Sequence, residues 1–147
     1  EELEKYIFSC GLYKSKAAHI LSASRDIVDK FSGQVPSGFS DLKSLAGVGQ
    51  KTANVVSSVW FEKDAIAVDT HVFRVSNRLG LAKASTPAKT EEQLKVSIPQ
   101  ADWSKAHHWL IWHGRRICHS QKPDCGNCPL SECCDYYADR QEKQKGE

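Results

Sequence analysis

The chain has 147 residues, of which 40% are hydrophobic and 26% charged, a composition typical of one or two globular domains. No apolar run approaches the ~20 residues that a membrane span requires, and no secretory signal opens the chain, so we expect a protein that is neither secreted nor in contact with a membrane. The net charge is only +2 and there is no polybasic arm, so any surface for nucleic acid must be a local patch.

The first predicted element is a helix that is already under way at residues 1–4. Because the chain contains no Met, we expect the natural amino terminus to lie upstream. Apolar residues at helical spacing predict a second helix over 15–31, with Ser15 as its N-cap. Glycine, proline and serine then predict a loop over 32–38.

Two helices separated by paired glycines follow this loop. The first is short and is capped by Ser40, and the second runs over 50–61. Gly47-Val48-Gly49 breaks the chain between them, because glycine lets the backbone turn tightly. The apolar residues expected to face inward are Leu42, Leu45, Val55, Val56 and Val59.

A short apolar run and a strongly capped helix come next. Residues 65–68 are too few to distinguish a strand from another buried segment. Asp69 is the expected N-cap of a helix that reaches Leu79, and Gly80 is a natural residue to end it.

The remaining elements are also helical. After a loop over 82–89, Thr90 and Gln93 resemble a capping box for a helix through Ile98. A further helix is predicted from residue 103 to 117, and the polar tail 139–147 is expected to be disordered. The side chains expected in the core include all four tryptophans, Trp60, Trp103, Trp109 and Trp112. The predicted class is all-α.

Five of the six cysteines fall within seventeen residues. The spacing is Cys118-x6-Cys125-x2-Cys128-x5-Cys134, with Cys133 as an alternative fourth ligand. Four thiolates held this closely suit a four-iron cluster. Structural zinc sites more often bring two ligand pairs separated by a hairpin or helix. We favour an iron–sulfur cluster over zinc, and zinc over disulfides.

The glycine hairpin and the lysine after it form a second candidate site. Backbone amides at the start of a helix can donate to a phosphate, although a plain turn between helices explains the glycines equally well. Lys51 stands in the first helical turn, where the helix dipole disfavours an ammonium, and partial burial would act in the same direction. A lysine with more free amine can form a Schiff base, whereas the commoner fate of a lysine is simple solvation.

Four stretches and the cysteine spacing match one family in register. The stretches are Gly11-Leu12-Tyr13-x-Ser15-Lys16-Ala17, Leu45-Ala46-Gly47-Val48-Gly49-Gln50-Lys51-Thr52-Ala53-Asn54-Val55-Val56, Ala67-Val68-Asp69-Thr70-His71-Val72-x-Arg74-Val75-x-Asn77-Arg78 and His108-Trp109-Leu110-Ile111-x-His113-Gly114-Arg115. Together they resemble the endonuclease III group of helix–hairpin–helix DNA glycosylases. The chain departs from the family at Ala46, where proline is usual, and in the family's opening helices, which have no counterpart here.

The resemblance implies a partial helical barrel at 1–64 with the helix–hairpin–helix at 41–61, and a helical iron–sulfur domain at 65–138. It implies Lys51 as nucleophile and Asp69 as its carboxylate partner. It also implies a [4Fe-4S] cluster on the four cysteines, with Cys134 rather than Cys133 as the fourth ligand. The implied protein is a cytoplasmic (bacterial nucleoid) or nuclear monomer that removes oxidised pyrimidines and nicks abasic sites in double-stranded DNA. Sister glycosylases that only remove a base lack this lysine. The implied DNA contacts are Leu12, Gly47, Val48, Gly49, Gln50, His71 and Lys122.

Simpler explanations stand beside several of these assignments. Leu12 would be a wedge in the duplex or a core leucine, Asp69 also suits a helix cap, and His71 suits a buried hydrogen-bonded histidine. Lys122 suits a solvated surface lysine. For the whole chain, the alternatives are a non-catalytic DNA-binding module, an inactive fragment of such an enzyme, or an electron-transfer iron–sulfur protein.

Overall fold

The computed structural model describes residues 2–145, which form two units divided at the Ser57–Ser58 bond. The first unit contains α1 (Glu2–Ile7), α2 (Tyr13–Phe31), α3 (Phe39–Ser44) and most of α4 (Gln50–Val59). The second contains α5 (Thr70–Leu79), α6 (Pro87–Ser97), η1 (Gln100–Asp102), α7 (Trp103–Arg116), η2 (Ser131–Cys133) and α8 (Asp135–Lys145). No strand occurs within residues 2–145, which confirms the all-α class, and none of their helices is long and apolar enough to cross a membrane.

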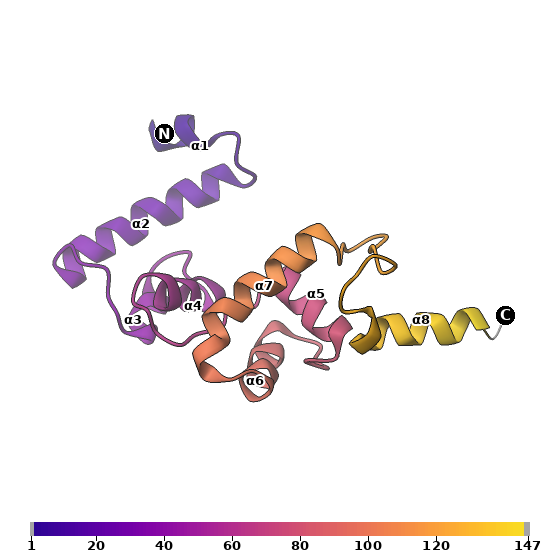
Figure 1. Cartoon of the computed structure of the whole chain (residues 1–147). Helices are drawn as coiled ribbons and strands as arrows, with labels where there is room; N and C mark the ends of the chain where they lie inside the picture. The colour runs from indigo at the N-terminus through magenta and orange to yellow at the C-terminus, as the bar shows by residue number, and fades with distance from the viewer. Residues whose placement is uncertain (1, 146–147) are drawn as a thin grey trace. The chain divides into compact units, whose positions relative to one another are not determined.

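In the first unit, α1 packs against the long helix α2 (Figure 1). Helix α2 begins two residues before the predicted Ser15 cap. Its N-cap is Leu12, which lies in the left-handed region and makes no side-chain cap bond. The carbonyl of Leu12 instead accepts from the Lys16 amide at 3.0 Å, so the helix starts from backbone geometry. The buried apolar residues of this unit are Ala17, Leu42, Leu45 and Ala53.

Helix α4 corrects the predicted inward face. Val59 is 62% exposed, and Val55 and Val56 are only partly buried. The residues that α4 buries are the smaller Ala53, Asn54 and Ser57. The helix also ends at Val59, two residues before the predicted limit.

The core of the second unit forms where α5 packs against α7, and the two helices lie side by side in Figure 1. Residues 65–68 form neither helix nor strand, yet all four are buried, so their apolar character reflects a buried irregular segment. The buried core residues are Ile66, Val68, Val72, Val75, Leu94, Ala106 and Leu110.

The start of one helix in this unit differs from expectation. Helix α6 begins at Pro87, capped by Thr86, whose hydroxyl accepts from the Lys89 amide. Proline suits the first helical position because its fixed φ is already helical and its missing N–H has no intrahelical partner to lose. Thr90, the predicted cap, is instead fully buried, and its hydroxyl donates to the carbonyl of Thr86.

The predicted disordered tail is helical as far as the described residues extend. Helix α8 continues to Lys145, and residues 146–147 lie outside the described part of the chain. Alanine, arginine, glutamine, glutamate and lysine, which fill residues 138–145 apart from Asp139, are nearly all strong helix formers. Low hydrophobicity therefore gave a misleading prediction here, because helix propensity and the contacts of α8 with α5 both favour the helix.

The tryptophans also correct a prediction. Trp60, Trp109 and Trp112 are 73%, 59% and 53% exposed, and only Trp103 is partly buried against the core. Trp112 instead supports the guanidinium of Arg116, which lies 4.3 Å from its ring centroid. Helical spacing placed Trp109 and Trp112 on a helix, but it did not indicate which face of α7 the core covers.

Candidate functional site

The glycine hairpin joins α3 to α4 through residues 45–49. The amide of Val48 donates to the carbonyl of Leu45 at 3.1 Å, which closes the turn. Gly47 has a φ of +74°, and a Cβ at this position would lie 2.8 Å from the Cβ of His19 on α2. Gly47 is therefore required by the packing of the first unit. Gly49, by contrast, has open space where a Cβ would project, so its backbone is accessible to a partner.

Lys51 lies in the first turn of α4, directly after this hairpin. Its side chain is exposed rather than partly buried. Gln50, the first residue of the helix, accepts a hydrogen bond from the Lys43 ammonium at 3.4 Å, which ties the two helices of the hairpin together.

Asp69 begins α5 and caps it. One carboxylate oxygen, Oδ1, accepts from the amides of His71 at 2.9 Å and Val72 at 2.8 Å. The side chain is half-buried, since the buried segment 65–68 precedes it. The structure therefore holds this carboxylate at a fixed place and leaves its second oxygen outside these two bonds. Lys51 and Asp69 belong to different units of the structure.

His71 is a partly buried, hydrogen-bonded histidine. Its Nδ1 lies 3.2 Å from Nη2 of Arg74. A guanidinium can only donate, so Nδ1 accepts and a neutral imidazole carries its proton on Nε2. The same Arg74 nitrogen donates to the carbonyls of Gly114 at 2.9 Å and Cys118 at 3.0 Å. His71 is thus fixed beside the helix cap.

Leu12 and Lys122 share an unusual backbone. Both are exposed, Leu12 by 82%, and both lie in the left-handed region, with φ values of +59° and +48°. Residues other than glycine enter this region at a cost in free energy, and Ser32 and Glu62 also do so. The core-leucine explanation for Leu12 does not agree with this exposure.

Four cysteines line one pocket in the second unit. Cys133 does not line it: its thiol is exposed and donates to the carbonyl of Leu130. The adjacent Cys134 faces the pocket instead, because successive side chains point in different directions. The lining cysteines are Cys118, Cys125, Cys128 and Cys134, and the apolar and aromatic lining residues are Leu79, Ile117, Pro123, Tyr136 and Tyr137.

Burial governs the titration of two groups in this pocket. Desolvation raises the pKa of the Cys134 thiol; the nearby Cys118 and Cys128 raise it further, while backbone hydrogen bonds from Tyr137 and Tyr136 lower it. Desolvation also lowers the pKa of His113, whose Nε2 lies 3.6 Å from the sulfur of Cys128. The thiolate form of Cys134 is therefore difficult to maintain here unless a cationic centre compensates its charge.

Arg78 is a functional candidate that sequence reasoning missed. Its guanidinium donates to the sulfur of Cys118 at 3.4 Å and to the carbonyls of His119 at 2.6 Å and Ser120 at 3.0 Å. Arg74, one turn earlier on α5, donates to the carbonyl of Cys118. The available signal was an arginine pair at i, i+4 on a helix without an acidic residue between Thr70 and Leu79.

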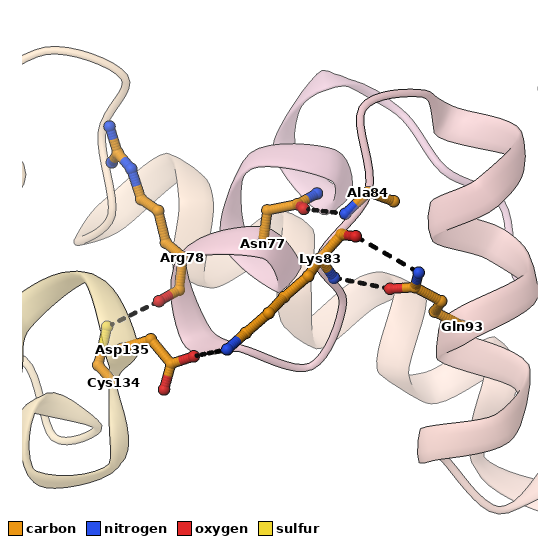
Figure 2. Close-up of polar contacts among 7 residues, drawn as sticks. All are labelled: Asn77, Arg78, Lys83, Ala84, Gln93, Cys134 and Asp135. Carbon is orange, nitrogen blue, oxygen red and sulfur yellow. Dashed lines mark hydrogen bonds and ion pairs between the residues drawn. The ribbon is translucent and has the colours of Figure 1, made fainter.

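The last cysteine is held by the turn that follows α5. The thiol of Cys134 donates to the carbonyl of Arg78 at 3.3 Å, and the Lys83 ammonium forms an ion pair with the Asp135 carboxylate at 3.1 Å. Figure 2 draws both contacts. Gly80 has a φ of +86°, and a Cβ there would lie 2.5 Å from Asp135 Oδ2. The glycine thus permits the close approach of the Cys134 segment.

The side chain of Gln93 on α6 braces this turn. Its amide accepts from the backbone N–H of Lys83 at 2.6 Å and donates to the Lys83 carbonyl at 3.4 Å (Figure 2). Asn77 accepts from the amide of Ala84 at 2.8 Å. Sequence reasoning assigned Gln93 to a capping box, whereas the structure uses it to hold the loop that receives Cys134.

Comparison with known proteins finds a matching family and similar relatives. The family described as HhH-GPD superfamily base excision DNA repair protein matches residues 1–100. Endonuclease III of Rickettsia conorii is 50% identical over 137 residues, which cover 93% of this chain and 65% of that protein. The chain therefore spans about 65% of the length of this relative.

Two solved structures have closely similar folds. A trapped covalent intermediate of endonuclease III with DNA superposes with a TM-score of 0.90 at 45% identity, over 95% of this chain and 66% of that one. A thermostable thymine-DNA glycosylase superposes with a TM-score of 0.83 at 27% identity, over 94% of this chain and 65% of that one. The likeness extends over nearly the whole chain, including the cysteine loop.

Proposed function

Because the chain belongs to the HhH-GPD superfamily of base excision DNA repair proteins, we propose that it is a bifunctional DNA glycosylase and abasic-site lyase that acts on oxidised pyrimidines. Its similarity to endonuclease III supports this choice within the superfamily. The observation that carries the proposal is Lys51 at the first turn of α4, directly after the glycine hairpin. A related endonuclease III has been trapped as a covalent intermediate with DNA, which requires a nucleophile in that protein.

In the proposed reaction, the damaged base leaves the helical stack so that the sugar becomes accessible. The lone pair of the Lys51 amine attacks C1′ while the glycosidic C1′–N bond breaks, and the base departs with the bonding electrons and takes up a proton. The amine then loses its proton, and opening of the sugar ring gives an imine to C1′. Loss of a proton from C2′ breaks the C3′–O bond, which releases the 3′-phosphate.

Asp69 is proposed to assist proton transfer and to stabilise positive charge that develops on the sugar. Its two backbone hydrogen bonds fix the carboxylate before substrate binds, so no reorganisation is needed when charge develops. Capping and chemistry are compatible because the two bonds use Oδ1 alone. His71 follows Asp69 by two residues, and we propose that it contacts DNA from this edge of α5.

The hairpin is proposed to bind a phosphate of duplex DNA. The accessible backbone at Gly49 and the start of α4 supports this role, because amides at a helix N-terminus donate to anions regardless of base sequence. The proposed hairpin contacts are Gly47, Val48, Gly49 and Gln50. Lys122 is proposed as a further phosphate contact, since its left-handed backbone displays the side chain on the loop between two of the cysteines.

Leu12 is proposed as the residue that enters the space left by the extruded base. An 82% exposed leucine on a left-handed backbone has an apolar side chain that the protein itself does not cover. Apolar side chains that insert between base pairs work in this way in other proteins that deform DNA.

The four pocket cysteines are proposed to hold a [4Fe-4S] cluster. Four thiolates that line one pocket suit a four-iron cluster, in which each iron takes one terminal thiolate. When bound, the cluster would cross-link the loop from Cys118 to Cys134 and keep it ordered.

Duplexes that contain thymine glycol, or an abasic site, test the proposed function. The wild-type chain is expected to release the oxidised base and to nick both duplexes, with the 3′-phosphate eliminated. Binding that depends on salt but produces no nick would instead indicate a non-catalytic DNA-binding module or an inactive fragment. The absence of salt-dependent affinity for DNA would favour an electron-transfer protein.

Replacing Asp69 by asparagine should separate capping from chemistry. The asparagine oxygen can still accept from the amides of His71 and Val72, so the thermal unfolding midpoint should change little. The carboxylate charge is lost, and the nicking rate should fall by about 10²–10⁴-fold. Single-turnover cleavage of abasic-site DNA measures this effect, and an unchanged rate would exclude a chemical role for the carboxylate.

The two hairpin glycines should respond differently to alanine. Gly47→Ala forces a Cβ against His19 on a left-handed backbone and should destabilise the chain by about 1–3 kcal/mol. Gly49→Ala meets no atom within 4 Å and should leave stability unchanged. It should nevertheless weaken binding to undamaged duplex severalfold, because the added methyl group keeps the phosphate from the backbone. Equal affinity of Gly49→Ala and wild type would contradict the phosphate site.

A further inference from the structure

The backbone immediately before Asp69 is buried and irregular. Residues 65–68 are at most 9% exposed and belong to no helix or strand. Carbonyl groups in such a segment lack the partners that regular structure supplies, and an unsatisfied buried carbonyl is costly. The partner of the Ala67 carbonyl comes from α7, forty residues away along the chain.

That partner is His107, which is itself only 8% exposed. Its Nδ1 lies 2.7 Å from the carbonyl oxygen of Ala67. A carbonyl oxygen only accepts, so Nδ1 carries the hydrogen and donates it. The ring is also packed edge-on against His108, with centroids 5.2 Å apart and planes at 79°. A short buried hydrogen bond thus fixes the backbone two residues before Asp69.

The same face of α7 also contacts the residues that follow Asp69. Gly114 lies seven residues after His107, which is about two helical turns. A Cβ at Gly114 would lie 3.1 Å from Cβ of His71 and 3.0 Å from a methyl group of Val75. Helix α7 therefore holds the chain on both sides of Asp69, by a hydrogen bond before it and by close packing after it.

We propose that His107 is a positioning residue for Asp69. Its Nδ1–H fixes the Ala67 peptide, and through it the backbone from which the Asp69 side chain projects toward the amides of His71 and Val72. The catalytic meaning of this inference rests on the proposed function, whereas the positioning itself is a property of the fold. His107 donates to a backbone carbonyl, so another side chain of suitable size with an N–H donor should partly replace His107.

The matched variants are His107→Asn and His107→Leu, whose new side chains have nearly the same size and differ in the presence of an N–H donor. Amide hydrogen exchange followed by NMR reports the hold on Asp69 through the amides of His71 and Val72, which donate to Oδ1. In His107→Leu these two amides should exchange at least about tenfold faster, through local opening, and in His107→Asn they should stay near the wild-type rate.

The Ile98 amide, which donates to the Leu94 carbonyl in α6, serves as an internal standard. If His107→Leu destabilises the whole unit, the Ile98 amide should exchange faster by the same factor as the His71 and Val72 amides, and this result would overturn the proposal. Unchanged exchange of the His71 and Val72 amides would overturn it as well. Should His107→Leu fail to fold, the wild type still decides: a slowly exchanging Nδ1–H resonance of His107 is expected, and its absence would overturn the proposal.

The nicking assay adds the catalytic readout. His107→Leu should lower kcat on abasic-site DNA about tenfold with little change in KM, and His107→Asn should restore most of the loss. A rise in KM or a loss of DNA affinity with unchanged kcat would indicate a DNA-binding role and would contradict positioning. If the wild type neither nicks nor is trapped on DNA, the proposed function fails, while the exchange measurements still decide the role of His107.

Discussion

Replacing Lys51 by glutamine is expected to abolish the covalent adduct that borohydride traps between the wild-type chain and abasic-site DNA. Borohydride reduces the imine between a protein amine and C1′, and glutamine has no amine that can form it. The Lys51 side chain is exposed, so the substitution should leave the free energy of unfolding within about 0.5 kcal/mol of the wild-type value. The adduct is measured as a shifted band after denaturing electrophoresis.

Lys43 provides the matched control for this experiment. It is also an exposed lysine of the hairpin, and it bonds to Gln50 across the turn. Lys43→Gln removes the same charge from the same unit but should retain the adduct. Trapping that persists in Lys51→Gln, or that disappears equally in both variants, would exclude Lys51 as the nucleophile.

The neighbouring cysteines Cys133 and Cys134 should differ sharply when each is replaced by alanine. Cys134→Ala removes a pocket thiol and should yield protein that lacks bound iron and the visible absorption of an iron–sulfur cluster. Cys133→Ala removes an exposed thiol outside the pocket and should keep both. Because metal binding contributes directly to folding free energy, Cys134→Ala should also unfold at a markedly lower temperature.

Anaerobic purification with iron and sulfide analysis measures both outcomes. Loss of iron in Cys133→Ala together with retention in Cys134→Ala would reverse the ligand assignment. A colourless wild-type protein that contains zinc would refute the cluster itself. The salt bridge between Lys83 and Asp135 is exposed and should contribute little, so Lys83→Gln is a suitable neighbouring control with unchanged iron content.

Features that depend on a few neighbouring residues were predictable from the sequence. Asp69 was expected to cap a helix that ends at Gly80, and the structure confirms both ends of α5. The all-α class and the resemblance to endonuclease III are also confirmed. A helix cap requires only a side-chain oxygen within one turn of its amides, and a family motif is a local order of residues, so both are present in the sequence itself.

Other local predictions were wrong because several local signals competed. Thr90 with Gln93 resembled a capping box, but Thr86 followed by Pro87 gives an earlier and equally good start for α6. Similarly, the polar tail has the composition of a disordered segment and also the propensity of a helix, and α8 follows propensity. Thr90 is fully buried, which its local sequence does not indicate.

Only the tertiary structure decided which groups meet across long stretches of chain. The hydrogen bond from His107 to Ala67 and the bond from Arg78 to Cys118 each join residues about forty positions apart. The exposure of Trp109 depends on which face of α7 the core covers. The sequence by itself determined most of the helices, the Asp69 cap and the cysteine spacing, because these depend on residues within a short stretch of chain, and the family motif supplied the nucleophile candidate. Burial and positioning depend on how α5, α6 and α7 pack, and no local pattern contains that information.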